Sequence, residues 1–377
     1  MQICFLSNYF NHHQKPLSDS LYEMTFGEYY FVATSEISEW RKKLGYQEMT
    51  APYVLNYNSN NKARIDNIIL SSDVVIIGAA DRKLIQERLK KGGLTFLCTE
   101  RIYWESIPWY RLVSHYIKFG IWYRRYKNLY LLCASAFTYQ DFLRTHTFKN
   151  KAYKWGYFPP FVKYNCHSLI ESKEHLNKLN GFINILWVGR LIDWKHPESC
   201  IVLAEKLKQK GYRFRISMIG IGDLETQLKK TVKEKNLDKE IDFLGSMSTE
   251  CVRKMMDNSS IFLATSNEQE GWGAVLNEAM NSACAVVTSN VMGSAPYLVA
   301  DGFNGLLFDS GNWEKMANLV EFLIINSEIR KSISFNAYST IEREWNASIA
   351  ALRLLDLSKE IKKGEYNPFT EGPCSKA

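Results

Sequence analysis

The amino-acid sequence predicts an α/β protein made of two doubly wound, Rossmann-like domains that face each other across a cleft. The first reason is length, because 377 residues exceed what one hydrophobic core usually supports. The second is that short β-rich runs alternate with segments of helical apolar spacing, which is typical of parallel strands joined by crossover helices. The third is that this alternation occurs in two series, with a polar stretch between them.

The first series predicts an amino-terminal domain over residues 1–165. Its strands are expected at residues 1–7, 29–35, 74–79, 94–100 and 129–135. Around residues 163–181 the pattern changes to a polar stretch, which we interpret as the connector to the second domain.

The second series predicts a carboxyl-terminal domain over residues 166–345. Its strands are expected at residues 183–190, 214–222, 240–245, 260–266, 284–289 and 304–308. Open α/β sheets bind ligands at the carboxyl ends of their strands, so the cleft bordered by the following loops is the expected site. The tail, residues 346–377, is helical in pattern and then irregular, and it is a candidate to pack back on the amino-terminal domain.

Composition excludes several classes of protein. No segment reaches the roughly 18 consecutive apolar residues that a membrane-spanning helix needs. The amino terminus reads as a first strand and not as a basic leader before a long apolar stretch, so we expect no secretion signal. The 8 cysteines occur singly, with no Cys-x-x-Cys pair, which favours reduced thiols in the cytoplasm.

The segment that carries the most chemical information runs from Ser266 to Met280. It follows an expected strand, and Gly271 and Gly273 flank a turn into a helix. Glycines let the backbone approach a ligand, and the free amides at a helix start favour an anion such as a diphosphate. Glu270 lies in the turn, and Glu278 lies about two helical turns further on.

Two glutamates separated by seven residues, in a strand, glycine-rich turn and helix, resemble the signature of retaining glycosyltransferase family 4, of the GT-B fold and the bacterial surface-polysaccharide type. Other elements resemble the family in the same order: Gly189 to Leu191 followed by Lys195, then residues 219–228, 243–245 and 301–308. The match covers about residues 184–310, and the amino-terminal half resembles the family mainly in architecture.

The resemblance implies a role for each matching residue. Arg190 and Lys195 would neutralise the diphosphate of the donor, Glu278 would bind the ribose hydroxyls, and Glu270 would hold hydroxyls of the transferred sugar. The other implied donor-binding residues are Gly271, Gly273, Gly220, Gly222, Gly245 and Met247. Independently of the family, fixed cations stabilise a leaving diphosphate more in the transition state than in the ground state.

The sequence departs from the family pattern at two places. The usual Gly-x-Pro after the helix is replaced by residues 283–285 (Ala-Cys-Ala), and Tyr297 stands where a glutamate is common. The chain also contains no Asp-x-Asp, the usual clamp for a metal and a diphosphate in the other large transferase fold. We therefore expect activity without a metal and without a cofactor, on a UDP- or GDP-sugar donor.

The amino-terminal half contributes candidates for the acceptor side. His12, His13 and Asn11 lie in the loop after the first expected strand, and that loop faces the cleft in this architecture. Glu100 and Arg101 end the fourth expected strand at the same edge. Glu100 is a candidate general base for the acceptor hydroxyl, and the sequence does not distinguish it from half of a structural ion pair.

A basic and aromatic segment over residues 101–128 is a candidate membrane contact. The first 165 residues have a net charge of +9 and the remainder −2. Arg111, Lys118 and Arg125 are seven residues apart, so a helix would place them nearly in line beside an aromatic face. That composition is typical of a helix on an anionic membrane surface, and the alternative is a core helix with a solvated basic edge. Its aromatic residues are Tyr103, Trp104, Trp109, Tyr110, Tyr116, Phe119, Trp122, Tyr123 and Tyr126.

The resulting hypothesis is a metal-independent, hexosyltransferase-type enzyme that transfers a sugar, with retention, from a nucleoside diphosphate to a hydroxyl of a glycan or lipid-linked acceptor. It would be cytoplasmic and peripheral on the inner face of the membrane. The alternatives are a nucleotide-sugar epimerase or phosphorylase of the same architecture, and a non-catalytic sugar-binding protein. A dehydrogenase is disfavoured because the first strand lacks a Gly-x-Gly-x-x-Gly turn, and no nucleic-acid-binding module is recognisable.

Overall fold

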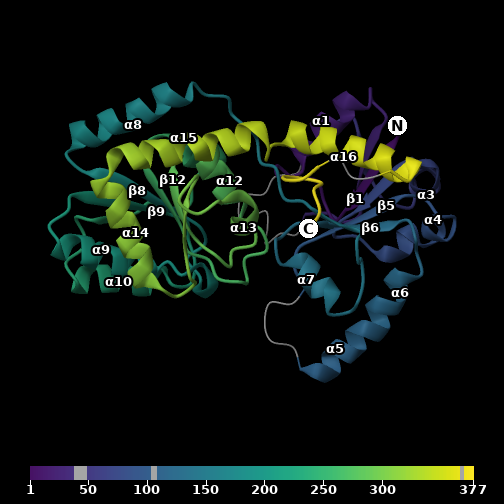
Figure 1. The fold of residues 1–377 in the computed structure, drawn as a ribbon, viewed down its shortest axis with the longest axis horizontal. Coiled ribbons are helices and arrows are strands. Elements are labelled where there is room, and N and C mark those ends of the chain that lie inside the picture. The colour runs from purple at the N-terminus through teal and green to yellow at the C-terminus, as the bar shows by residue number, and fades with distance from the viewer. Residues whose placement is uncertain (38–48, 103–107, 366–368) are drawn as a thin grey trace. The chain divides into compact units, whose positions relative to one another are not determined.

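A computed structural model describes residues 1–37, 49–102, 108–365 and 369–377 (Figure 1). The chain forms two compact units. Unit 1 comprises residues 1–160 together with residues 344–377, and unit 2 comprises residues 161–343. The chain therefore returns to unit 1 after completing unit 2.

The described part of unit 1 holds a parallel sheet in the order β3-β2-β1-β4-β5-β6-β7. Its strands are β1 (Ile3–Ser7), β2 (Tyr29–Ala33), β3 (Val54–Asn56), β4 (Val74–Ile77), β5 (Thr95–Thr99), β6 (Leu129–Cys133) and β7 (Ala152–Lys154). The strand order reverses between β1 and β4, so the loops after these strands diverge at a topological switch point, where such sheets bind ligands.

Helices cover both faces of this sheet. The helices of the described part of unit 1 are α1 (Lys15–Met24), α3 (Lys62–Ser71), η1 (Arg82–Ile85), α4 (Gln86–Lys90), α5 (Trp109–His115), η2 (Tyr116–Gly120), α6 (Ile121–Arg124), α7 (Thr138–Leu143) and α16 (Ala347–Lys363). Cys4 and Leu6 of β1 belong to a core formed with α3, α4, α6 and α7. On the other face, Ser18 of α1 bonds the Tyr29 hydroxyl of β2 at 2.8 Å.

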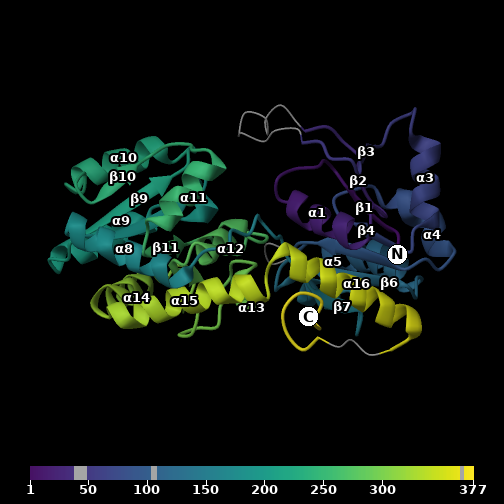
Figure 2. The same ribbon diagram turned by 90° about the horizontal axis from the view of Figure 1, so that it is seen from above.

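The tail is part of unit 1. Helix α16 packs beside α1 (Figure 2) and begins at Asn346, whose side chain accepts a hydrogen bond from the Ile349 amide. Lys362 near its end pairs with Asp73 at 2.5 Å. The last residues then run along the edge strand β7, where the Lys154 amide donates to the carbonyl of Ser375 at 2.8 Å.

The described part of unit 2 holds a second parallel sheet, in the order β10-β9-β8-β11-β12-β13. Its strands are β8 (Ile183–Val188), β9 (Phe214–Ile219), β10 (Ile241–Phe243), β11 (Ile261–Ala264), β12 (Ala285–Ser289) and β13 (Leu306–Phe308). Its helices are α8 (Cys166–Asn180), η3 (Asp193–Lys195), α9 (Ser199–Gln209), α10 (Glu225–Glu234), α11 (Thr249–Asp257), α12 (Ala274–Asn281), α13 (Ala295–Leu298), α14 (Trp313–Ile325) and α15 (Ser327–Arg343). The prediction of two parallel, helix-covered sheets is confirmed.

The predicted polar connector at residues 163–181 is wrong, because most of it is the helix α8. Asn165 caps its start by accepting from the Ser168 amide, and Gly181 ends it in the left-handed conformation at φ 71°. The helix lacks a long apolar stripe because two of its buried side chains are charged. One of them, Lys173, donates to the main-chain carbonyls of Ser282 and Ala283 after α12.

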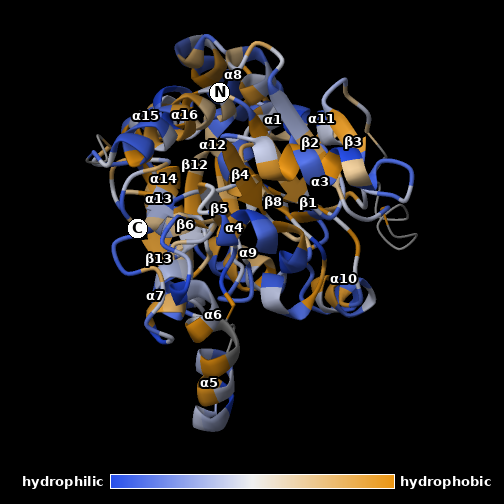
Figure 3. Cartoon of the chain, turned by 90° about the vertical axis from the view of Figure 1, so that its right-hand side faces the viewer, coloured by the Kyte–Doolittle hydropathy of each residue, from blue (hydrophilic) through white to orange (hydrophobic). Residues whose placement is uncertain are grey.

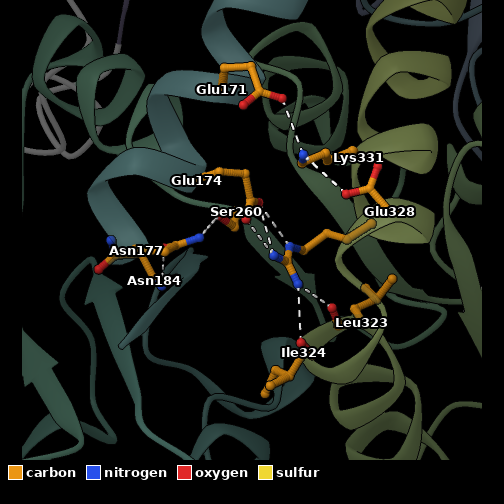
Figure 4. A network of polar contacts seen from close by, with 10 residues as sticks. Glu171, Glu174, Asn177, Asn184, Ser260, Leu323, Ile324, Glu328 and Lys331 are labelled. Atoms are coloured by element: carbon orange, nitrogen blue, oxygen red, sulfur yellow. Dashed lines mark hydrogen bonds and ion pairs between the residues drawn. The ribbon is translucent and has the colours of Figure 1, made fainter. Parts of the chain in front are cut away.

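The other buried charge on α8 is Glu174, which pairs with Arg330 of α15 at 2.8 Å (Figure 4). Arg330 also donates to the carbonyls of Leu323 and Ile324 at the end of α14. Buried charges persist only when they are paired and hydrogen-bonded, and this network satisfies both groups. It thereby ties α8, α14 and α15 together.

Candidate functional site

Three loops at the carboxyl ends of β8, β9 and β10 meet through glycine backbone. A Cβ atom at Gly220 would lie 1.8 Å from the carbonyl oxygen of Gly189, and one at Gly222 would lie 2.3 Å from that of Leu191. The Gly220 amide also donates to the carbonyl of Gly245 at 2.8 Å. Glycine is therefore required at 220 and 222 for loop-to-loop packing. Contact of Gly220, Gly222 and Gly245 with a donor stays a prediction.

Met247 follows in the loop between β10 and α11. Its side chain is half-buried. Gly245, two residues earlier, has φ 68° and open space where a Cβ would stand. The donor-binding role of Met247 is a prediction that rests on the resemblance.

The turn between β11 and α12 is fixed by a neighbouring loop. Gly273 precedes α12 with φ 83°, and a Cβ there would lie 1.9 Å from the Met292 methyl carbon. The Gly293 amide donates to the carbonyl of Glu270 at 3.2 Å, and Gly271 is buried in the same turn. The first turn of α12 is therefore held next to Glu270, and the positive end of the helix dipole there favours an anion.

Lys195 and Glu270 form an ion pair, although they are 75 residues apart in the chain. Their side chains are only 14% and 16% exposed. The Ser266 hydroxyl donates to the same carboxylate oxygen of Glu270 at 3.2 Å. The structure thus brings together two residues that the sequence assigned to different parts of one donor.

Arg190 lies in the same loop as Lys195 and is exposed. Its guanidinium stacks over the Trp194 ring, with 5.1 Å from the central carbon to the ring centroid. The Trp194 carbonyl in turn accepts from the Asn267 amide at 2.9 Å. Arg190 thus adds a second positive charge to the loop that carries Lys195.

Glu278 lies on α12 next to Arg253 of α11. Burial raises the pKa of the Glu278 carboxyl, and the positive charge of Arg253 partly offsets that rise. Arg253 donates to the main-chain carbonyl of Glu278 at 3.0 Å and to the side chain of Asn281 at 3.1 Å. A buried carboxyl of this kind is a candidate to bind a ligand hydroxyl.

In unit 1, residues from three strand ends form one polar cluster. The His12 and His13 rings lie 3.9 Å apart in the loop after β1, and His13 stacks near the Tyr157 ring at 6.4 Å. Asn11 anchors this loop by accepting from the His13 amide at 2.8 Å. Burial raises the pKa of Tyr157, and its hydrogen bond to Glu100 raises it further. Burial also lowers the pKa of His12.

Sequence reasoning placed Glu100 and Arg101 at this edge and missed Tyr157. Arg101 lies 3.8 Å from Asp141 of α7 and stacks over Phe137, whereas Glu100 bonds Tyr157. Tyr157 was missed because it follows β7, whose sequence, Ala-Tyr-Lys, contains no apolar run that would mark a buried strand. The available signal was an aromatic pair, Trp155 and Tyr157, just after that strand.

The basic and aromatic segment is helical from α5 through η2 to α6, and α5 extends away from the sheet of unit 1 (Figure 3). Four of its exposed apolar side chains are spaced four residues apart: Trp109, Val113, Ile117 and Ile121. The adjacent Tyr110 is exposed as well. Tyr103 and Trp104 lie outside the described residues, as do the side chains of Lys118 and Phe119. Among the helices of the described ranges, none combines the length and apolarity needed to cross a bilayer.

A separate hollow of about 460 Å³ in unit 1 is lined in part by Arg88, Lys91 and Lys362. Arg88 is buried and donates to the carbonyls of Ile69, Ser72 and Leu94. Through these bonds the guanidinium of Arg88 connects these main-chain segments. We therefore interpret Arg88 as a structural residue.

Each unit is a parallel, helix-covered sheet, which is the arrangement of the GT-B fold. Residues 170–340 match the sequence model of the family described as "Glycosyl transferases group 1". This match covers most of unit 2.

Curated relatives match about half of the chain. This chain is 29% identical over 184 residues to the amylovoran biosynthesis glycosyltransferase AmsK of Erwinia amylovora. The alignment covers 48% of this chain and 45% of AmsK. It is 30% identical over 183 residues to the uncharacterized glycosyltransferase MJ1069 of Methanocaldococcus jannaschii, with the same coverages. The match thus spans about half the length of the curated relatives.

Solved structures match nearly the whole chain in fold. The Anabaena protein HepE, crystallised in complex with UDP, superposes with a TM-score of 0.67 at 15% identity, covering 97% of this chain and 99% of HepE. A glycosyltransferase from Rickettsia africae gives a TM-score of 0.67 at 19% identity with the same coverages. These likenesses show the GT-B fold.

Proposed function

We propose that the protein is a retaining glycosyltransferase that moves a sugar from a nucleoside-diphosphate sugar to a hydroxyl of a glycan or lipid-linked acceptor. The observation that carries the proposal is the contact of Lys195 with Glu270, beside Arg190. A cation for a diphosphate and a carboxylate for sugar hydroxyls are the two groups that a nucleotide sugar requires. Both lie in the domain that matches the group 1 family.

The chemistry of the transfer follows from charge. When the glycosidic bond breaks, negative charge accumulates on the leaving diphosphate, and Arg190, Lys195 and the first amides of α12 stabilise it there. Retention would proceed by attack of the acceptor on the same face, with the leaving phosphate taking the acceptor proton. These two cations support activity without a metal.

The donor is proposed to be a UDP- or GDP-linked hexose. HepE, which shares the fold, was crystallised with UDP-glucose, and this favours UDP among the candidates. AmsK and the colanic acid glycosyltransferase WcaL of Salmonella typhimurium are named for exopolysaccharide synthesis. These names support our proposal that the protein acts in surface-polysaccharide assembly, and we propose the cytoplasm as its location.

The acceptor is proposed to bind unit 1. Glu100 is positioned by Tyr157, and His12 and His13 stand beside them at the ligand-binding edge of the parallel sheet. A carboxylate and imidazoles are groups that bind sugar hydroxyls through hydrogen bonds. A lipid-linked acceptor would agree with the exposed apolar residues of α5 and η2, which we propose contact an anionic membrane surface.

A thermal-shift panel of nucleotide sugars in the presence of a chelator tests the proposal. We expect one donor to raise the melting temperature of the wild type, and Glu278→Ala to weaken that response. Glu234→Ala, at an exposed position at the end of α10, is the matched control and should respond as the wild type does. If no donor shifts the wild type, the alternative of a non-catalytic sugar-binding protein takes precedence.

A further inference from the structure

We propose that the ion pair between Lys195 and Glu270 makes the site select a nucleotide sugar over the corresponding free nucleoside diphosphate. The inference rests on the proposed function and extends it to the distinction between donor and product. It assigns Glu270 a second role, as a competitor with the diphosphate for Lys195.

The backbones that carry the pair are held on both sides, so only the side chains are free to exchange partners. The Thr265 hydroxyl donates to the Lys195 carbonyl at 2.6 Å, and the Asn267 amide donates to the Trp194 carbonyl at 2.9 Å. On the other side, the Gly293 amide donates to the Glu270 carbonyl at 3.2 Å. The two loops therefore keep Lys195 within reach of Glu270 whether or not a ligand is present.

A diphosphate that recruits Lys195 must take it from Glu270. The Glu270 side chain is 16% exposed. Of the hydrogen bonds to its carboxylate that the structure shows among the described residues, the one from the Ser266 hydroxyl then remains. A largely buried carboxylate without its cation is costly, and it also lies close to the new negative charge. A nucleoside diphosphate alone bears that cost in full.

A nucleotide sugar offsets the cost, because its sugar hydroxyls donate to Glu270 in place of Lys195. Both side chains then have a new partner: Lys195 binds phosphate oxygens, and Glu270 accepts hydrogen bonds from sugar hydroxyls. After transfer the sugar leaves with the acceptor, and Glu270 again competes for Lys195. The pair thus favours donor binding before the reaction and product release after it.

The test is to measure the dissociation constants of UDP and UDP-glucose, or of GDP and the GDP-sugar if the panel selects that base. In Glu270→Gln, Lys195 no longer has a competing carboxylate. We expect the nucleoside diphosphate to bind about tenfold more tightly, the size expected for one charge-assisted hydrogen bond, and the nucleotide sugar to bind no more tightly than to the wild type.

Two further variants separate this exchange from a general charge effect. Glu268→Gln removes the same charge from the same loop and should change the affinity for both ligands equally and only slightly. Ser266→Ala removes the bond that holds the released carboxylate, so it should weaken UDP severalfold more than UDP-glucose.

The proposal is overturned if Glu270→Gln tightens both ligands alike, or if Ser266→Ala weakens both alike. It is also overturned if Glu268→Gln reproduces the effect of Glu270→Gln. A wild type that binds no nucleotide at all would instead reject the proposed function, so the two failures are distinguishable.

Discussion

At the residue scale, Glu278 combines a proposed binding role with a cost in stability. Burial raises its pKa, so the folded chain holds this proton more tightly than the unfolded chain does. The free energy of unfolding therefore falls as the pH rises through the raised pKa, where the folded protein must ionise a buried group.

This sign gives a prediction for Glu278→Gln, which carries no charge at any pH. Its melting temperature should exceed that of the wild type at pH 8 and equal it near pH 4, where Glu278 is protonated in the folded state. Calorimetry across this range measures the difference. A variant that is less stable at pH 8 would contradict the prediction, and donor binding should weaken in either case.

Tyr157 gives a second prediction at this scale, because it holds Glu100 through one hydrogen bond. Tyr157→Phe should reduce transfer to a sugar acceptor about tenfold through KM for the acceptor, and leave hydrolysis of the donor by water unchanged. Tyr130→Phe, at another partly exposed tyrosine of unit 1, is the control. Equal losses of transfer and hydrolysis would indicate a merely structural role.

The sequence predicted individual residues of the site better than it predicted which of these residues contact each other. Glu270 and Lys195 were predicted from local motifs, each readable within a few residues. Their contact was not, because it depends on how the β8 and β11 loops fold toward each other across 75 positions of sequence. The contacts of Ser266 with Glu270 and of Trp194 with Arg190 were not predicted for the same reason, because tertiary structure determines them.

At the element scale, α5 and η2 expose apolar side chains spaced four residues apart. Trp109 is 77% exposed and Ile117 is 59% exposed, and burying such a side chain in an apolar environment contributes about 2 kcal/mol. The double variant Val113→Asp/Ile117→Asp should therefore lower binding to vesicles containing anionic lipid at least tenfold.

Sedimentation with vesicles measures this binding. Leu179→Asp, at a 72% exposed apolar residue of α8 in unit 2, is the matched control and should bind as the wild type does. Binding to purely zwitterionic vesicles should be weaker than to anionic ones. Equal binding of the wild type and the double variant would contradict the membrane contact.

Helix α8 shows what periodicity cannot predict. Its polar sequence was interpreted as a connector, because Lys173 and Glu174 stand where a helix usually presents apolar residues to the core. The structure satisfies both charges with partners from α15 and from the residues that follow α12, which no local pattern reveals. The capping residues Asn165 and Gly181 were the signals that could have identified the helix.

At the scale of the whole molecule, the alternation of strands and helices was sufficient to predict both parallel sheets. All the predicted strands are present, because buried parallel strands are continuous apolar runs. The edge strands β3 and β7 were missed. The equally short edge strands β10 and β13 were predicted, because they overlap the motifs at residues 243–245 and 301–308, whereas β3 and β7 overlap no such motif. The attachment of the last residues along β7 is set by backbone hydrogen bonds, which side-chain patterns do not encode.

The central claim is that this fold transfers sugars from a nucleotide donor with retention. The most direct measurement is nuclear magnetic resonance of the selected nucleotide sugar incubated with the wild type and a chelator, in the absence of an acceptor. The account predicts slow release of the nucleoside diphosphate, and a sugar that first appears in the anomeric configuration of the donor. No release, or first appearance of the opposite anomer, would contradict it.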